Sequence, residues 1–128
     1  MVLKFEEAHD MKRKVIQLVY SLNLSHINVN SISCFRSKGS KTRAYARIWE
    51  FPRILQLALK QDPHYVIELI NPKFDGLNEE EKEKVLIHEL MHIPHNFSGS
   101  LRPHGNLLGK YLDRKIDDMH KKFRQQYL

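Results

Sequence analysis

Apolar residues along this chain follow two spacings, one typical of helices and one typical of strands. In residues 4–23 the apolar residues recur at helical spacing, which predicts an amphipathic N-terminal helix. Residues 105–125 show the same spacing and predict a C-terminal helix. The predicted inward stripes are Phe5, Ala8, Met11, Val15, Val19 and Leu22 in the first helix, and Leu108, Leu112, Ile116, Met119 and Phe123 in the second.

Three shorter segments carry the alternating or β-branched pattern of strands. Residues 26–35 and 43–50 alternate, and a Gly/Ser-containing turn at 36–42 joins them, so we expect an antiparallel hairpin. A phase slip near Asn30-Ser31 suggests a β-bulge in the first of these strands. Residues 64–70 are apolar almost throughout and predict a third, buried strand.

Two further helices are expected between and after these strands. Pro52 suits the first turn of a short helix from Arg53 to about Gln61. A longer helix begins at Asn78 as N-cap and ends before Pro94. Its second half is apolar nearly all round, which indicates a buried central helix. The residues expected to point inward from the short helix are Ile54, Leu55, Ala58 and Leu59.

These elements predict one α+β domain over residues 1–128, with a small three-stranded mixed sheet packed on the central helix and helices at both ends. The single Cys34 excludes an internal disulfide framework. No apolar run approaches the roughly 18 residues of a membrane span, and the charged N-terminus has no signal core, so we expect a cytoplasmic protein without membrane contact.

The formal charge of +6 allows a nucleic acid or another polyanion as partner. Lys38, Lys41 and Arg43 lie in or beside the predicted hairpin turn. They are either a phosphate-contacting arm or the solvated tip of a hairpin.

A metal-ligand pattern lies at the end of the central helix. Residues 88–92 read H-E-x-x-H, the pattern of zinc hydrolases. On a helix, His88 and His92 lie about 40° apart around the axis and about 6 Å apart along it, so both imidazoles can reach one Zn²⁺. Glu89 flanks that position, which suits the general base for a zinc-activated water. The alternative is a pair of core histidines hydrogen-bonded to the backbone.

A third zinc ligand is expected after Pro94. His95 would share the face of His88 and His92 only on an unbroken helix, and Pro94 interrupts that helix. His104 is bracketed by proline and glycine, and the twelve residues from His92 can span up to roughly 40 Å, enough to loop out and return. We therefore predict His104 as the third ligand.

The same residues resemble a known family. Asn71-Pro72 after a strand, the acidic helix start, the H-E-x-x-H segment and His104-Gly105 are similar to SprT-like and minigluzincin-type zinc metalloproteases, most of all to their small archaeal relatives. The resemblance covers about residues 64–112 and implies a zincin-like fold, zinc as cofactor and a polypeptide substrate. Leu107 and Leu108 replace an aromatic residue common in that family, and no zinc ribbon follows. The roles it implies are His88, His92 and His104 as zinc ligands and Glu89 as general base.

Two functions of different classes follow from the sequence. The first is a zinc-dependent metallopeptidase, associated with DNA if the resemblance extends that far. The second is a nucleic-acid-binding module with a structural or degenerate zinc site. Glu89 favours the enzyme, because a structural site needs no carboxylate beside its metal. A peptidase also needs a donor for the developing oxyanion, and Arg102, His95 and Tyr111 are the candidates.

Overall fold

The structure is a computed structural model that describes residues 2–103 and 109–127. Within those ranges the chain is an α+β fold with four α-helices and a four-stranded mixed sheet. The helices are α1 (His9–Ser21), α2 (Arg53–Leu59), α3 (Glu79–Leu90) and α4 (Gly109–Tyr127), and a 3₁₀ turn, η1, spans Val29–Ser31. The strands are β1 (Lys4–Glu7), β2 (Ile32–Lys38), β3 (Ala46–Trp49) and β4 (Tyr65–Asn71).

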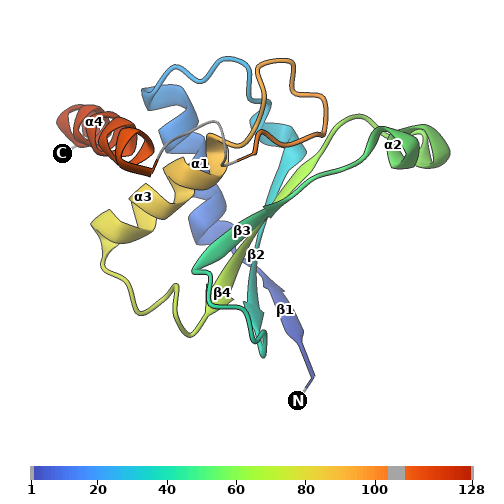
Figure 1. The fold of residues 1–128 in the computed structure, drawn as a ribbon, viewed down its shortest axis with the longest axis horizontal. Helices are drawn as coiled ribbons and strands as arrows, with labels where there is room; N and C mark the ends of the chain where they lie inside the picture. The colour runs from blue at the N-terminus through green and yellow to red at the C-terminus, as the bar shows by residue number, and fades with distance from the viewer. Residues whose placement is uncertain (1, 104–108, 128) are drawn as a thin grey trace.

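The sheet has the strand order β1-β2-β4-β3, so β1 and β3 are its edges. β4 pairs in parallel with β2 and antiparallel with β3, and β1 pairs antiparallel with β2. Helices α1, α3 and α4 gather on one side of this sheet, whereas α2 lies at the end of an arm that projects from the body (Figure 1). None of the described helices is long and apolar enough to cross a bilayer.

The hydrophobic core lies between the sheet and the three gathered helices. It joins Val15 of α1, Ile67 of β4 and Leu86 of α3, all with no exposed surface, to Phe123 of α4. The prediction of a buried apolar central helix is confirmed by α3. The stripe of the C-terminal helix is confirmed at its buried positions Leu112, Ile116 and Phe123, while Leu108 lies outside the described residues.

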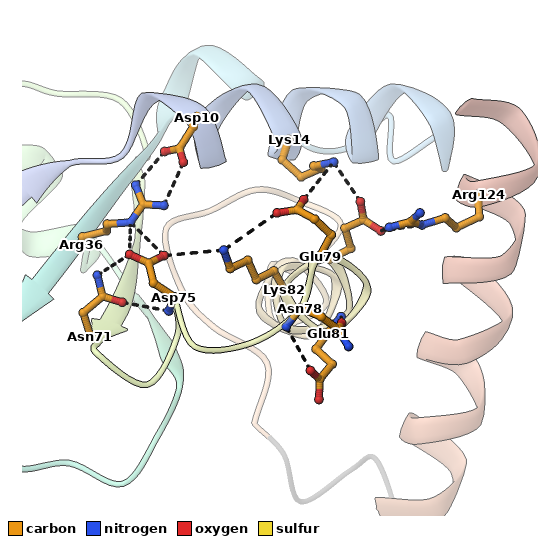
Figure 2. A network of polar contacts seen from close by, with 11 residues as sticks. Asp10, Lys14, Arg36, Asn71, Asp75, Asn78, Glu79, Glu81, Lys82 and Arg124 are labelled. Atoms are coloured by element: carbon orange, nitrogen blue, oxygen red, sulfur yellow. Dashed lines mark hydrogen bonds and ion pairs between the residues drawn. The ribbon is translucent and has the colours of Figure 1, made fainter. Parts of the chain in front are cut away.

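The start of α3 is fixed by polar contacts. Asn78 is the N-cap that the sequence predicted, and with Glu81 it forms a capping box, each side chain bonded to the other residue's backbone N–H. Figure 2 shows the ion pairs around it. Arg36 of β2 binds both Asp10 of α1 and Asp75 in the β4–α3 loop, and Lys14 of α1 approaches Glu79. These contacts tie α3 to α1 and the sheet, and so set the position of its other end.

The N-terminal segment differs from the prediction of one helix over residues 4–23. Lys4–Glu7 is the strand β1, and the helix starts only at His9. All four residues of β1 are exposed, so burial gives the segment no reason to be helical. The ladder to β2, which pairs Lys4 with Lys38 and Glu7 with Phe35, satisfies its backbone groups instead.

The predicted hairpin of residues 26–35 and 43–50 is also wrong. β4 lies between β2 and β3, and residues 29–31 form η1 rather than a bulged strand. Alternation identifies a strand but not its partner. Here β4 pairs with β2 on one side and with β3 on the other. The sheet has four strands where the sequence predicted three, because the predicted helical segment Lys4–Glu7 adds β1.

Helix α2 begins after Pro52 as predicted, but its orientation is the reverse of the prediction. Ile54, Leu55 and Leu59 are 70%, 44% and 59% exposed, and Ala58 is exposed as well, whereas Gln56 is buried. The Gln56 side chain donates to the carbonyls of Phe51 and Ser98, and these two bonds hold that side of the helix against the body.

Candidate metal centre and active site

The H-E-x-x-H residues lie at the C-terminal end of α3. His88 and Glu89 are in its last turn, and His92 follows two residues after Leu90, in a turn where its backbone N–H bonds to the Glu89 carbonyl. This tightened turn still brings the two imidazoles together, with ring centroids 5.2 Å apart and ring planes at 63°. The spacing therefore places both side chains at one point even though the α-helix ends between them.

His92 is held in one orientation by Arg102. Its Nδ1 lies 2.6 Å from the Arg102 carbonyl oxygen, and the Arg102 N–H donates to the His92 carbonyl at 2.7 Å. A carbonyl oxygen only accepts hydrogen bonds, so Nδ1 carries the proton and the neutral ring keeps its lone pair on Nε2. Metal-binding histidines are oriented in this way by a backbone carbonyl behind the ring.

Glu89 is a buried carboxyl group with 8% of its surface exposed. Burial raises the pKa of Glu89 to about 7, and the backbone N–H of Ile48 in β3, which donates to the carboxylate, opposes that rise. A carboxyl group with a pKa near neutrality can both accept and return a proton under ordinary conditions. The buried Glu89 carboxyl group is therefore suited to the role of a general base.

Two hollows meet at His88 and Glu89. One, of about 460 Å³, lies between α3, α4 and the start of β3; its lining includes Lys84, Asp113, Ile116 and Asp117. The other, of about 510 Å³, lies between β3 and the segment 101–103; its lining includes Ala44, Ile48, His92 and Arg102. Ala46 of the edge strand also lines both. The histidine–glutamate group thus lies at the middle of a cleft that follows β3.

The other candidates for the third metal ligand and for the oxyanion donor lie in different places. Arg102 lines the second hollow beside His92. His95 is exposed, lines neither hollow, and its ring lies 4.7 Å from that of His26. His104 lies outside the described residues, as does the side chain of Tyr111. Within the described part of the chain, no three His, Cys, Asp or Glu side chains gather as a metal site.

A buried ionic cluster behind the site was not anticipated from the sequence. Glu83 of α3 is 2% exposed and bonds to Lys14, His120 and Arg124, and so joins α1 and α4 to α3. Glu83 precedes the buried Leu86 by three residues and Leu90 by seven, so helical spacing places it on the core-facing side. A carboxylate buried on the core-facing side of a helix requires cations around it. The spacing of Glu83 from Leu86 and Leu90 could therefore have predicted this ionic cluster.

The chain matches a known protein family over most of its length. Residues 3–124 match the family described as "Putative phage metallopeptidase". The chain belongs to this family. Searches among curated proteins and among solved structures found no match. Membership in this family supports metallopeptidase activity and a metal cofactor for the chain. The finer resemblance to SprT-like and archaeal enzymes stays a prediction.

Proposed function

We propose that this member of the phage metallopeptidase family is a zinc-dependent peptidase with Glu89 as general base. The observation that carries the proposal is the buried Glu89 carboxyl beside two clustered imidazoles in an open cleft. Family membership supports the peptidase class, and the tautomer that Arg102 imposes on His92 suits a metal ligand.

The donor set fits zinc. Two neutral imidazoles from one helix end suit Zn²⁺, and His104 is the proposed third ligand. When bound, zinc supplies a Lewis acid that activates water and polarises a carbonyl. Three protein ligands would leave a position for water, as in catalytic rather than structural zinc sites.

Glu89 would handle the proton in this mechanism. It takes a proton from the attacking water and later returns it to the leaving amine, and its pKa near neutrality serves both transfers. The Ile48 N–H orients the carboxylate from the neighbouring strand. Arg102 lines the cleft next to His92, and its side chain is the proposed donor for the oxyanion.

The substrate is proposed to be a polypeptide bound as an extended strand along β3. β3 is a sheet edge, and the N–H of Ile48 points toward Glu89 rather than toward β4. Backbone groups of Ala46, two residues away, face the same side by strand alternation. An extended peptide can pair with such an edge and lay alternate side chains into the hollows on either side of Glu89.

Removal and restoration of metal tests this function. Hydrolysis of an unstructured protein should stop when a chelator strips zinc from the chain, and should return when zinc is added back. His88→Ala should not recover, whereas His9→Ala, which changes an exposed histidine on α1, should recover fully. Undiminished cleavage by protein shown to be metal-free would contradict the proposal.

A further inference from the structure

The hollow between α3, α4 and the start of β3 carries charged residues that the proposed mechanism does not use. Its volume is about 460 Å³, which is within the range that holds small-molecule ligands and so has room for one long side chain. The hollow reaches His88 and Glu89. Its lining also includes Lys84 of α3 and Asp113 and Asp117 of α4, and we call it the α4 hollow.

One of the two aspartates in the α4 hollow is already engaged. Lys84 Nζ lies 3.0 Å from Asp117 Oδ1, so these two groups neutralise one another. Asp113 precedes Asp117 by four residues, about 40° around the helix axis, and therefore lies on the same side of α4. Among the residues that the structure describes, none forms an ion pair with Asp113. The exposed Asp113 carboxylate is thus available to a substrate that enters the hollow.

The rest of the lining suits a long aliphatic side chain. Apolar surface comes from Tyr45, Ala46, Val85 and Ile116. Lysine and arginine pack their aliphatic stems along such surface while the charged end stays in water or meets a carboxylate. The face of an aromatic ring such as that of Tyr45, which is 46% exposed, also attracts cations. Apolar walls and one available carboxylate together fit a basic side chain.

The hollow on the other side of Glu89 has the opposite character. Its lining includes Arg102 and the apolar Leu101. A basic side chain placed there would meet a like charge, so the two hollows favour different residues of a bound peptide. Given the proposed peptidase function, on which this inference rests, we propose that Asp113 selects a lysine or arginine of the substrate. The substrate class is then a polypeptide with a basic residue close to the cleaved bond.

The overall charge of the chain opposes this preference rather than producing it. A net charge of +6 disfavours basic peptides wherever their positive charges lie. Asp113 favours a basic residue only at the peptide position that enters the α4 hollow. Because side chains of an extended peptide alternate between its two faces, the positions on either side of that one should show no such preference.

Peptides that share one cleaved bond, with Lys, Gln or Glu placed in turn at each nearby position, test this selection. At one position the zinc-loaded chain should cleave the Lys peptide with a kcat/KM about tenfold above that of the Gln peptide, the effect of a hydrogen bond to a charged group. Asp113→Asn should remove this preference, and Asp113→Lys should replace it with a preference for Glu. Asp118→Lys, the same change in charge at an exposed position of α4, should keep the parent's order of rates.

Peptide affinity gives a second measurement that does not depend on cleavage. In a Glu89→Gln chain, fluorescence anisotropy should show that adding Asp113→Asn weakens binding of the Lys peptide by about tenfold. Circular dichroism would establish that each variant is folded. Equal rates for Lys and Gln peptides at every position, or a Lys preference that survives Asp113→Lys, would overturn the selection by Asp113 and leave the peptidase function standing. Cleavage of none of the peptides would contradict the peptidase function itself, and the selection with it.

Discussion

At the scale of single residues, the environments of His92 and His95 differ in a way that bears on the proposed metal site. His92 is buried and held at Nδ1 by the Arg102 carbonyl, whereas His95 is exposed and lies against His26. We therefore retain His104 as the third ligand. His104→Ala should lower zinc affinity by more than the roughly 10–100-fold that loss of an outer-shell partner costs.

The matched control for that variant is His95→Ala, which should leave zinc affinity nearly unchanged. Competition with a chromogenic chelator measures both affinities. A large loss for His95→Ala and a small one for His104→Ala would reverse the assignment and move the metal site along the loop.

Asp10 gives a prediction for acid stability. Hydrogen bonds from Arg36 hold the pKa of Asp10 at about 2 in the folded chain, below its ordinary value of 3.8. A carboxyl with a lowered folded pKa stabilises the fold above its unfolded pKa and loses that contribution as pH falls through its folded pKa. The contribution should therefore be complete above pH 3.8 and disappear toward pH 2.

Asp10→Asn should lower the free energy of unfolding at neutral pH by roughly 0.2–1 kcal/mol, since the pair is partly exposed. Its loss of stability below pH 4 should also be shallower than that of the parent. Urea unfolding at several pH values measures both effects, and Asp118→Asn on the exposed side of α4 is the control. Parallel stability curves for Asp10→Asn and the parent would contradict the role of the Arg36 contact.

At the scale of elements, the basic residues at the end of β2 and in the segment between β2 and β3 bear on whether the protein binds DNA. Arg36 belongs to β2 and is engaged with Asp10 and Asp75, so it is not part of a basic loop. Lys38, Lys41 and Arg43 are exposed and stay available as a phosphate-contacting arm. DNA as a partner remains a prediction.

Replacing Lys38, Lys41 and Arg43 with glutamine should weaken DNA binding if they touch phosphates. The dependence of log affinity on log salt should become shallower by roughly 0.7–0.9 per lost contact. The triple variant Arg114→Gln, Lys121→Gln and Lys122→Gln on α4 carries the same change in charge. An unchanged slope for the first triple would make the segment a solvated loop.

Also at this scale, sequence patterns predicted helices better than strand partners. The capping box and apolar run of α3 contain within a few residues the contacts that define that helix. The partner of β3 depends on β4, which follows it in sequence and comes between β2 and β3. The outward face of α2 depends on Gln56 reaching the Ser98 carbonyl, 42 residues away. Contacts between residues so far apart in the sequence produce no recognisable pattern in either segment.

At the scale of the whole molecule, the fold brings a helix end, an edge strand and a loop to one cleft. The H-E-x-x-H spacing predicted the first of these from the sequence. The Ile48 N–H that reaches Glu89 and the Arg102 carbonyl that orients His92 are backbone groups, which no side-chain pattern reports. The sequence could therefore name candidate residues at the site but not the groups that orient them.

The most direct test of the metallopeptidase account is the zinc content and hydrolytic rate of Glu89→Gln, measured together. The amide keeps the shape of the side chain but cannot accept a proton at neutral pH. We predict one zinc per chain in both proteins and a rate lower by about 10²–10⁴-fold in the variant. Glu80→Gln, an exposed position on the same helix, should match the parent in both. Cleavage by Glu89→Gln at the parental rate would contradict the account.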